Sequence, residues 1–158
     1  GKLPVVKDIV SDRGPEIDLQ ISALIPEPYL PDVHTRLVLY KRIASVKNKD
    51  QLEALQVEMI DRFGLLSEPI KNLFQIAELK LLAQQLGIKK INAGPQGGVI
   101  EFIINPCINP ITIIQLIQKN PAQYKLEGPS RMRFITEQAS AELRIKHLFD
   151  LLYKLRVC

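Results

Sequence analysis

The spacing of apolar residues changes at Gly87, and this change limits the folds open to the chain. Between residues 32 and 86, apolar side chains recur every three or four positions, which predicts three helices. Beyond Gly87, two hairpin patterns alternate with two further helical segments. Helices and hairpins kept apart along the chain favour an α+β fold over a parallel α/β sheet. We therefore expect a helical N-terminal half packed on antiparallel β-hairpins, in a single compact domain.

Start and stop signals divide the N-terminal half. Residues 1–15 have little periodicity and end in a Gly-Pro step, so we expect a linker or tether there and the folded domain over residues 16–158. Apolar and polar residues alternate over 17–22, as in a half-buried strand. Three prolines within residues 26–31 then exclude a helix. The three helices are expected to begin at Asp32, Asp50 and Ser67.

The C-terminal half is expected to contain two hairpins. Strand-like runs at 88–93 and 99–104 flank the segment Gly94–Gly98, and runs at 123–127 and 131–136 flank a second turn. A glycine-rich segment can also cradle phosphate, but this one lies between strands and lacks the Lys-Ser/Thr of a phosphate-binding loop. We expect a hairpin turn there, and helices over 109–120 and 139–155.

The composition is that of an ordinary globular domain. The 158 residues are 46% hydrophobic and 24% charged, enough to build a core without a metal or a disulfide. Cys107 and Cys158 lie far apart and form no CxxC motif, so neither a zinc site nor a disulfide framework is indicated. No apolar run approaches the roughly 18 residues that span a bilayer, and no secretory leader is recognisable. We expect no membrane association and a cytoplasmic location.

Charge is distributed unevenly along the chain. The net charge is +4 at pH 7, but residues 1–79 carry ten basic and twelve acidic side chains, whereas residues 80–158 carry eleven basic and five acidic ones. Such halves can present complementary patches to two partners, or to another part of a longer chain. The alternative is that the uneven charge reflects random variation at solvent-exposed positions that bind no partner.

Residue types suited to catalysis are scarce. The two histidines, His34 and His147, lie in no zinc-binding spacing and next to no recognisable nucleophile. No nucleotide-binding motif of the Walker or dinucleotide type is present. We therefore expect no catalytic residue, no cofactor and no metal. A small enzyme is the alternative, and an ATPase assay tests it.

Two carboxylates are the leading candidates for an interaction site. Glu58 and Asp61 are three positions apart on the second predicted helix, so both project from roughly one side. Acid–base catalysis would require a cleft and two well-separated pKa values. The other interpretations are an idle solvated face and an acidic patch that docks against arginine or lysine on a partner.

Three basic residues are candidates for phosphate contacts. Arg131 and Arg133 alternate with apolar residues, so both guanidinium groups point from one face of a strand, and Lys125 lies on the preceding strand. Aromatic residues make up only 6% of the chain, and tryptophan is absent, so base stacking has little support. A DNA-contacting accessory domain is the alternative to a protein-docking domain.

Four segments occur together at fixed distances: IPEPYLPD at 25–32, YKRIA at 40–44, MIDRFG at 59–64 and GGVIEF at 97–102. In combination they resemble the C-terminal domain of bacterial transcription-repair coupling factors (Mfd). The resemblance runs from about Pro15 to the end of the sequence and implies a regulatory domain of a large ATP-dependent DNA translocase. Such a parent protein acts in nucleotide excision repair with RNA polymerase, UvrA and DNA.

The resemblance also implies how the domain works. It docks within its parent chain on a module that resembles UvrB, and it covers the surface that UvrA would use, which holds the factor autoinhibited. Glu58 and Asp61 match the acidic pair that meets arginines of that module. The fragment itself is expected to be monomeric and to carry no motor motif. The hypothesis requires an exposed acidic ridge that the chain's own cations do not neutralise.

Overall fold

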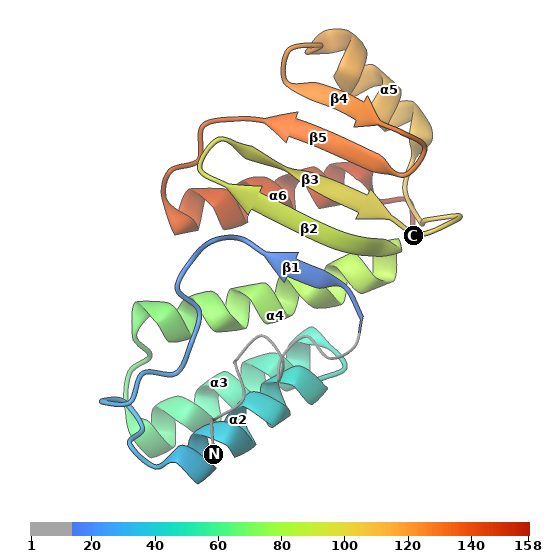
Figure 1. Ribbon diagram of the computed structural model, residues 1–158. Coiled ribbons are helices and arrows are strands. Elements are labelled where there is room, and N and C mark those ends of the chain that lie inside the picture. Colours follow the sequence, from blue (N-terminus) through green and yellow to red (C-terminus); the bar gives the residue numbers. More distant parts are fainter. Residues whose placement is uncertain (1–13) are drawn as a thin grey trace. The chain divides into compact units, whose positions relative to one another are not determined.

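The computed structural model describes residues 14–158 (Figure 1). Most of the expected tether, residues 1–15, lies outside the described residues. The last tether residue, Pro15, is buried, and the first strand begins directly after it. None of the helices within residues 14–158 is long and apolar enough to cross a membrane.

Helices and strands occur in the expected order, and the α+β class is confirmed. The elements are β1 (Glu16–Asp18), α2 (Val33–Ser45), α3 (Lys49–Phe63), α4 (Glu68–Leu86), β2 (Ile88–Gly94), β3 (Gly97–Phe102), α5 (Pro110–Lys119), β4 (Tyr124–Glu127), β5 (Arg131–Ile135) and α6 (Ala141–Leu155). We expected a single compact domain. The described chain divides into two compact units, one formed by residues 22–81 and the other by residues 14–21 together with 82–158. The boundary between them falls inside α4.

Capping residues define the helices of the unit formed by residues 22–81. The side chains of Asp32 and Asn48 accept hydrogen bonds from backbone N–H groups in the first turns of α2 and α3. Gly64 has a φ of 99° and ends α3, because glycine adopts this conformation without a steric penalty. The core is built from the proline-rich segment and the three helices: Ile25, Leu30, Leu39, Tyr40, Ile43, Leu52, Leu55, Met59, Ile70, Leu73, Phe74 and Ala77.

The second unit contains a five-stranded sheet in the order β1-β2-β3-β5-β4 (Figure 1). The two expected hairpins, β2–β3 and β4–β5, are both present, and β3 pairs antiparallel with β5. β1 adds to the edge in parallel with β2, where Glu16 aligns with Lys90. The sheet is therefore mixed: the two hairpins are antiparallel, as expected, and the first strand, whose partner was not predicted, is parallel to β2. A strand so distant in the sequence leaves no local signal of its partner.

The glycine-rich segment 94–98 is a hairpin connection, as predicted, but the strands extend into it. Only Pro95 and Gln96 remain between β2 and β3. Gly97 has a φ of 130°, and a Cβ atom placed there would overlap the carbonyl oxygen of Phe134 on β5. Glycine at this position therefore permits the close approach of two backbones, a structural role that involves no phosphate.

Replacing Gly97 by alanine is expected to lower the free energy of unfolding by about 3 kcal/mol, because the methyl group adds a backbone clash to an unfavourable φ. Urea unfolding followed by circular dichroism measures the change. Gly128 is the matched control, since its φ is also positive, at 71°, and a Cβ there meets nothing within 4 Å. Equal losses for Gly97→Ala and Gly128→Ala would contradict the steric explanation.

A buried arginine ties β1 to α6 within the second unit. Arg144 is only 3% exposed. Its guanidinium donates hydrogen bonds to the carbonyl oxygens of Leu19 (2.7 Å) and Gln20 (3.3 Å), which follow β1, and to those of Gln138 (3.2 Å) and Ala139 (3.1 Å), which precede α6. The Gln138 side chain is also buried and donates to the carbonyl oxygen of Gly94 (2.8 Å). Arg144 thus joins the segment after β1 to the segment before α6, and Gln138 joins the latter segment to the end of β2.

Cys107 and Cys158 form a disulfide, contrary to the expectation that no disulfide is indicated. Their Cα atoms are 5.8 Å apart, a usual separation for bonded cysteines. Backbone hydrogen bonds join the same two segments, from Asn109 N–H to the Leu155 carbonyl (2.8 Å) and from Val157 N–H to the Cys107 carbonyl (3.4 Å). The two cysteines are 51 residues apart and belong to no recognisable motif, so their pairing could not be predicted from the sequence.

Candidate functional site

The predicted acidic pair lies on α3, in the unit formed by residues 22–81. Leu52, Leu55 and Met59 are buried and fix the inner side of this helix. Glu58 is half-buried and Asp61 is exposed. Because successive residues of a helix are rotated by about 100°, Asp61 projects almost directly away from the buried side and Glu58 projects towards one flank. Neither carboxylate is enclosed, so the requirement of the hypothesis for accessible side chains is met.

Glu58 is paired with cations of its own chain. Arg42 on α2 contacts it in a bidentate manner, from Nη1 to Oε2 and from Nη2 to Oε1 (2.8 Å). Arg62, one turn further along α3, adds a third contact from Nη1 to Oε2 at 3.2 Å. These side chains keep 37–51% of their surface exposed, so the cluster is solvated. The condition that the chain's own cations leave the acidic ridge unneutralised therefore fails at Glu58 and holds only at Asp61.

Asp61 is the open member of the pair. Within residues 14–158 its carboxylate has no ion pair and no hydrogen bond. On the same outer side of α3, Val57 keeps 59% of its surface exposed. Asp61 thus lies on the outward surface of this helix beside an apolar side chain and the Arg42–Glu58 pair, and Glu53 is a second exposed carboxylate on α3, two turns before Asp61.

The hydrogen bonds from Arg42, reinforced by its charge and by Arg62, lower the pKa of Glu58 from 4.5 to about 2. Because the folded-state pKa is depressed, the stabilisation from this carboxylate is complete above pH 4.5 and is lost as the pH falls towards 2. An NMR titration of the Glu58 carboxyl carbon is expected to give a midpoint near 2. In Arg42→Gln the midpoint should rise towards 4.5, whereas Lys41→Gln, which removes a neighbouring charge, should leave it in place. A midpoint unaffected by Arg42→Gln would contradict the ion pair.

A shallow groove lies between α2 and α3, next to this ion pair. Its volume is about 340 Å³, and its lining includes both members of the Arg42–Glu58 pair together with Ser45, Val46, Gln51, Ala54 and Leu55. The groove holds no cluster of titratable groups suited to acid–base chemistry. Its composition is that of a contact surface with one charged edge.

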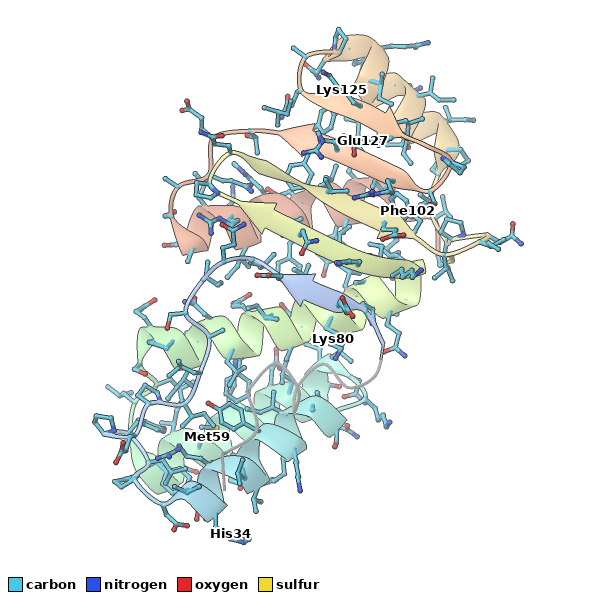
Figure 2. All side chains as sticks on the ribbon, viewed as in Figure 1. His34, Met59, Lys80, Phe102, Lys125 and Glu127 are labelled. Carbon is cyan, nitrogen blue, oxygen red and sulfur yellow. A yellow bond between two sulfur atoms is a disulfide. The ribbon has the colours of Figure 1, made fainter. Side chains whose placement is uncertain are left out.

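The predicted basic residues lie on the outward face of the sheet in the second unit. Lys125 is on β4 (Figure 2) and is directly opposite Arg133 on β5. Arg133 is itself paired with Glu127, from Nε to Oε1 and from Nη2 to Oε2 (3.4 Å). This pairing raises the pKa of Arg133 and lowers that of Glu127. One of the three candidate cations is thus neutralised by its own chain.

Arg131 belongs to a row of alternating charges that crosses all five strands. The aligned residues, from β1 to β4, are Glu16, Lys90, Glu101, Arg131 and Glu127. Opposite charges on neighbouring strands stabilise a sheet, and they also cancel its long-range field. The outward face of the sheet is therefore mixed in charge, which offers little attraction to a polyanion.

The histidines do not form a site. His34 is exposed in the first turn of α2, and the Nδ1 atom of His147 lies 3.1 Å from Oε1 of the buried Gln138. Among the described residues, no group of three or more metal-ligating side chains comes together.

Comparison with known proteins identifies the family. A family model described as the TRCF domain matches residues 19–113, a range that contains the acidic pair but not the three basic candidates. The chain belongs to the TRCF domain family. It is 44% identical over 146 residues to the transcription-repair-coupling factor of Escherichia coli K12, covering 92% of this chain and 13% of that protein. It is 43% identical over 152 residues to that of Haemophilus influenzae, covering 96% of this chain and 13% of that protein. The chain thus spans about an eighth of the length of these relatives.

The fold agrees with a solved member of the same family. The crystal structure of the C-terminal domain of a transcription-repair coupling factor superposes with a TM-score of 0.72 at 21% identity, covering 90% of this chain and 94% of that one. At this level of identity the likeness concerns the fold alone. The predicted family resemblance is confirmed.

Arg42 and Arg62 are the residues at this site that sequence reasoning missed. Both lie inside the motifs YKRIA and MIDRFG that carried the resemblance, but neither was a candidate site residue. The spacing of four between Glu58 and Arg62 is a local signal of an ion pair. Arg42 is 16 residues from Glu58, and no local pattern connects them.

Proposed function

We propose that this TRCF domain is a regulatory, non-catalytic module of a cytoplasmic transcription-repair coupling factor. In this role it docks on the UvrB-like module of its parent chain and masks the surface that UvrA would use. The observation that carries the proposal is the exposed, unpaired carboxylate of Asp61 on α3, inside the segment matched by the family model. The carboxylate of Glu58, one helical turn away, can join it when Arg42 releases it.

Modest contacts suit a domain that has to open. Arginine–carboxylate pairs are directional and charge-assisted, but solvated ones contribute little energy each. A docked state held by a few such pairs differs from the open state by only a few kcal/mol, so binding of another protein can shift the population. The exposed Val57 beside Asp61 supplies apolar area to the same contact.

Replacing Asp61 by arginine in the full-length factor is expected to raise its affinity for UvrA about 5-fold or more, because the reversed charge repels the arginines of the docking module and populates the open state. Isothermal titration of UvrA into the factor measures the affinity. Glu53→Arg is the matched control, since Glu53 is also exposed on α3, lies two turns away, and undergoes the same change of charge. An unchanged UvrA affinity for Asp61→Arg, with native circular dichroism, would overturn the proposal.

The rival hypothesis of a DNA-contacting domain has weaker support. Arg133 is paired with Glu127, and Arg131 stands between two carboxylates in the aligned row. A gel shift at physiological salt with the isolated chain is expected to show no complex with duplex DNA, because too few phosphates can be neutralised.

A further inference from the structure

The two acidic residues of the docking surface differ in availability. Asp61 meets solvent, whereas Glu58 accepts three hydrogen bonds from Arg42 and Arg62. A carboxylate offers about four acceptor positions. A guanidinium group from another module therefore cannot bind Glu58 side-on in the same bidentate manner unless at least Arg42 turns away.

The geometry of Arg42 permits such an exchange. Its side chain is 43% exposed, and solvated ion pairs of this kind are weak and rearrange readily. The two guanidinium groups that hold Glu58 are not equivalent. Arg42 makes the bidentate contact from a separate helix, while Arg62 makes a single longer contact at 3.2 Å within α3. Arg42 is therefore the principal competitor for any incoming arginine.

We propose that Arg42 acts as an internal competitor that weakens docking by occupying Glu58 in the undocked domain. The occupant that displaces it is an arginine side chain of a basic docking module, chosen by the charge of Glu58 and Asp61. Asp61 makes the first contact, because it needs no exchange. Glu58 follows when Arg42 moves away into solvent, which its side chain, 43% exposed, already meets in part. This inference rests on the proposed docking function and adds a residue that sets its strength.

The opposite role is physically possible and makes the inference testable. Arg42 could instead orient Glu58 for its partner, in which case its removal would weaken docking. Competition predicts instead that removal of Arg42 strengthens docking. It also predicts that the effect of Arg42 disappears when Glu58 no longer carries a charge, since Arg42 would then have nothing to withhold.

The test uses the full-length factor carrying Asp61→Asn, which is expected to weaken docking enough for changes in both directions to be measured. On this background, Arg42→Gln should lower the affinity for UvrA about 3- to 5-fold, since the freed Glu58 strengthens docking. Lys41→Gln is the control, because it removes a charge from the adjacent position of α2 that has no contact with Glu58. Arg42→Gln combined with Glu58→Gln should give the same UvrA affinity as Glu58→Gln alone.

The outcomes separate the two proposals. If Asp61→Asn leaves UvrA binding unchanged, the docking function fails and the competition falls with it. If Asp61→Asn raises UvrA binding but Arg42→Gln has no effect or raises it further, docking stands and the competition is wrong. An equal effect of Lys41→Gln and Arg42→Gln on UvrA affinity would show that only the loss of a positive charge matters. This too would overturn the inference.

Discussion

Replacement of Arg144 by methionine is expected to lower the free energy of unfolding by at least about 3 kcal/mol. The guanidinium is 3% exposed, and four backbone carbonyl groups surround it. Hydrogen bonds to a charged donor contribute about 1.5–3 kcal/mol each, and buried carbonyl groups left without a donor add a desolvation cost. Methionine fills similar space but donates nothing, so the carbonyl oxygens after β1 and before α6 lose their partner together.

Urea unfolding monitored by circular dichroism measures this loss. Lys146→Met removes a charge from the same helix at an exposed position, and we expect a change within about 0.5 kcal/mol. Arg144→Lys should recover only part of the stability, because an ammonium group lacks the planar fork that reaches carbonyl groups on both sides. A cost below about 1 kcal/mol for Arg144→Met would show that water replaces the guanidinium without difficulty.

Reduction of the Cys107–Cys158 disulfide is expected to destabilise the oxidised protein by about 4 kcal/mol, on the chain-entropy estimate for a loop of this length. For a chain of this size the melting temperature should fall by roughly 10 °C. The backbone hydrogen bonds that join the same segments persist without the sulfur–sulfur bond, so the native structure is kept and the loss arises from the freer unfolded chain. Thermal scans with and without a phosphine reductant measure the shift.

The double variant Cys107→Ser with Cys158→Ser is the control, since its melting temperature should not respond to reductant. Titration of free thiols in the unreduced protein should find none. Two free thiols and an unchanged melting temperature would contradict the bridge. In a reducing cytoplasm such bonds are rare, so the expected location and the observed pair together predict that the bridge forms only under oxidising conditions.

Helix ends and turns, which depend on short-range interactions, were predicted well from the sequence. Asp32 caps the first of the three helices and Gly87 directly follows the last of them, at the positions where the sequence places these ends. The helix caps, the hairpin turns and the exposed position of Asp61 all depend on neighbours within about four residues. Interactions between residues so close in the sequence can be inferred from the local order of side chains.

Long-range pairings were not predicted. The parallel addition of β1 to β2, the disulfide and the contact of Arg42 with Glu58 each join residues that no periodicity connects. The last of these changes the interpretation of the site, because a carboxylate that appears free in the sequence is occupied in the fold. Net charges counted along the sequence also differ from the net charges of the folded units. Residues 22–81 carry eight basic and eight acidic side chains, so the apparent acidity of the first half depended on where the chain was divided.

The path of the chain through its two units has a consequence for biogenesis. Among the described residues, one unit is the single stretch 22–81, whereas the other joins the short segment 14–21 to everything after residue 81. During synthesis on the ribosome, the uninterrupted stretch emerges whole and can fold at once. The leading strand must wait, unpaired, until the residues that complete its sheet have been translated.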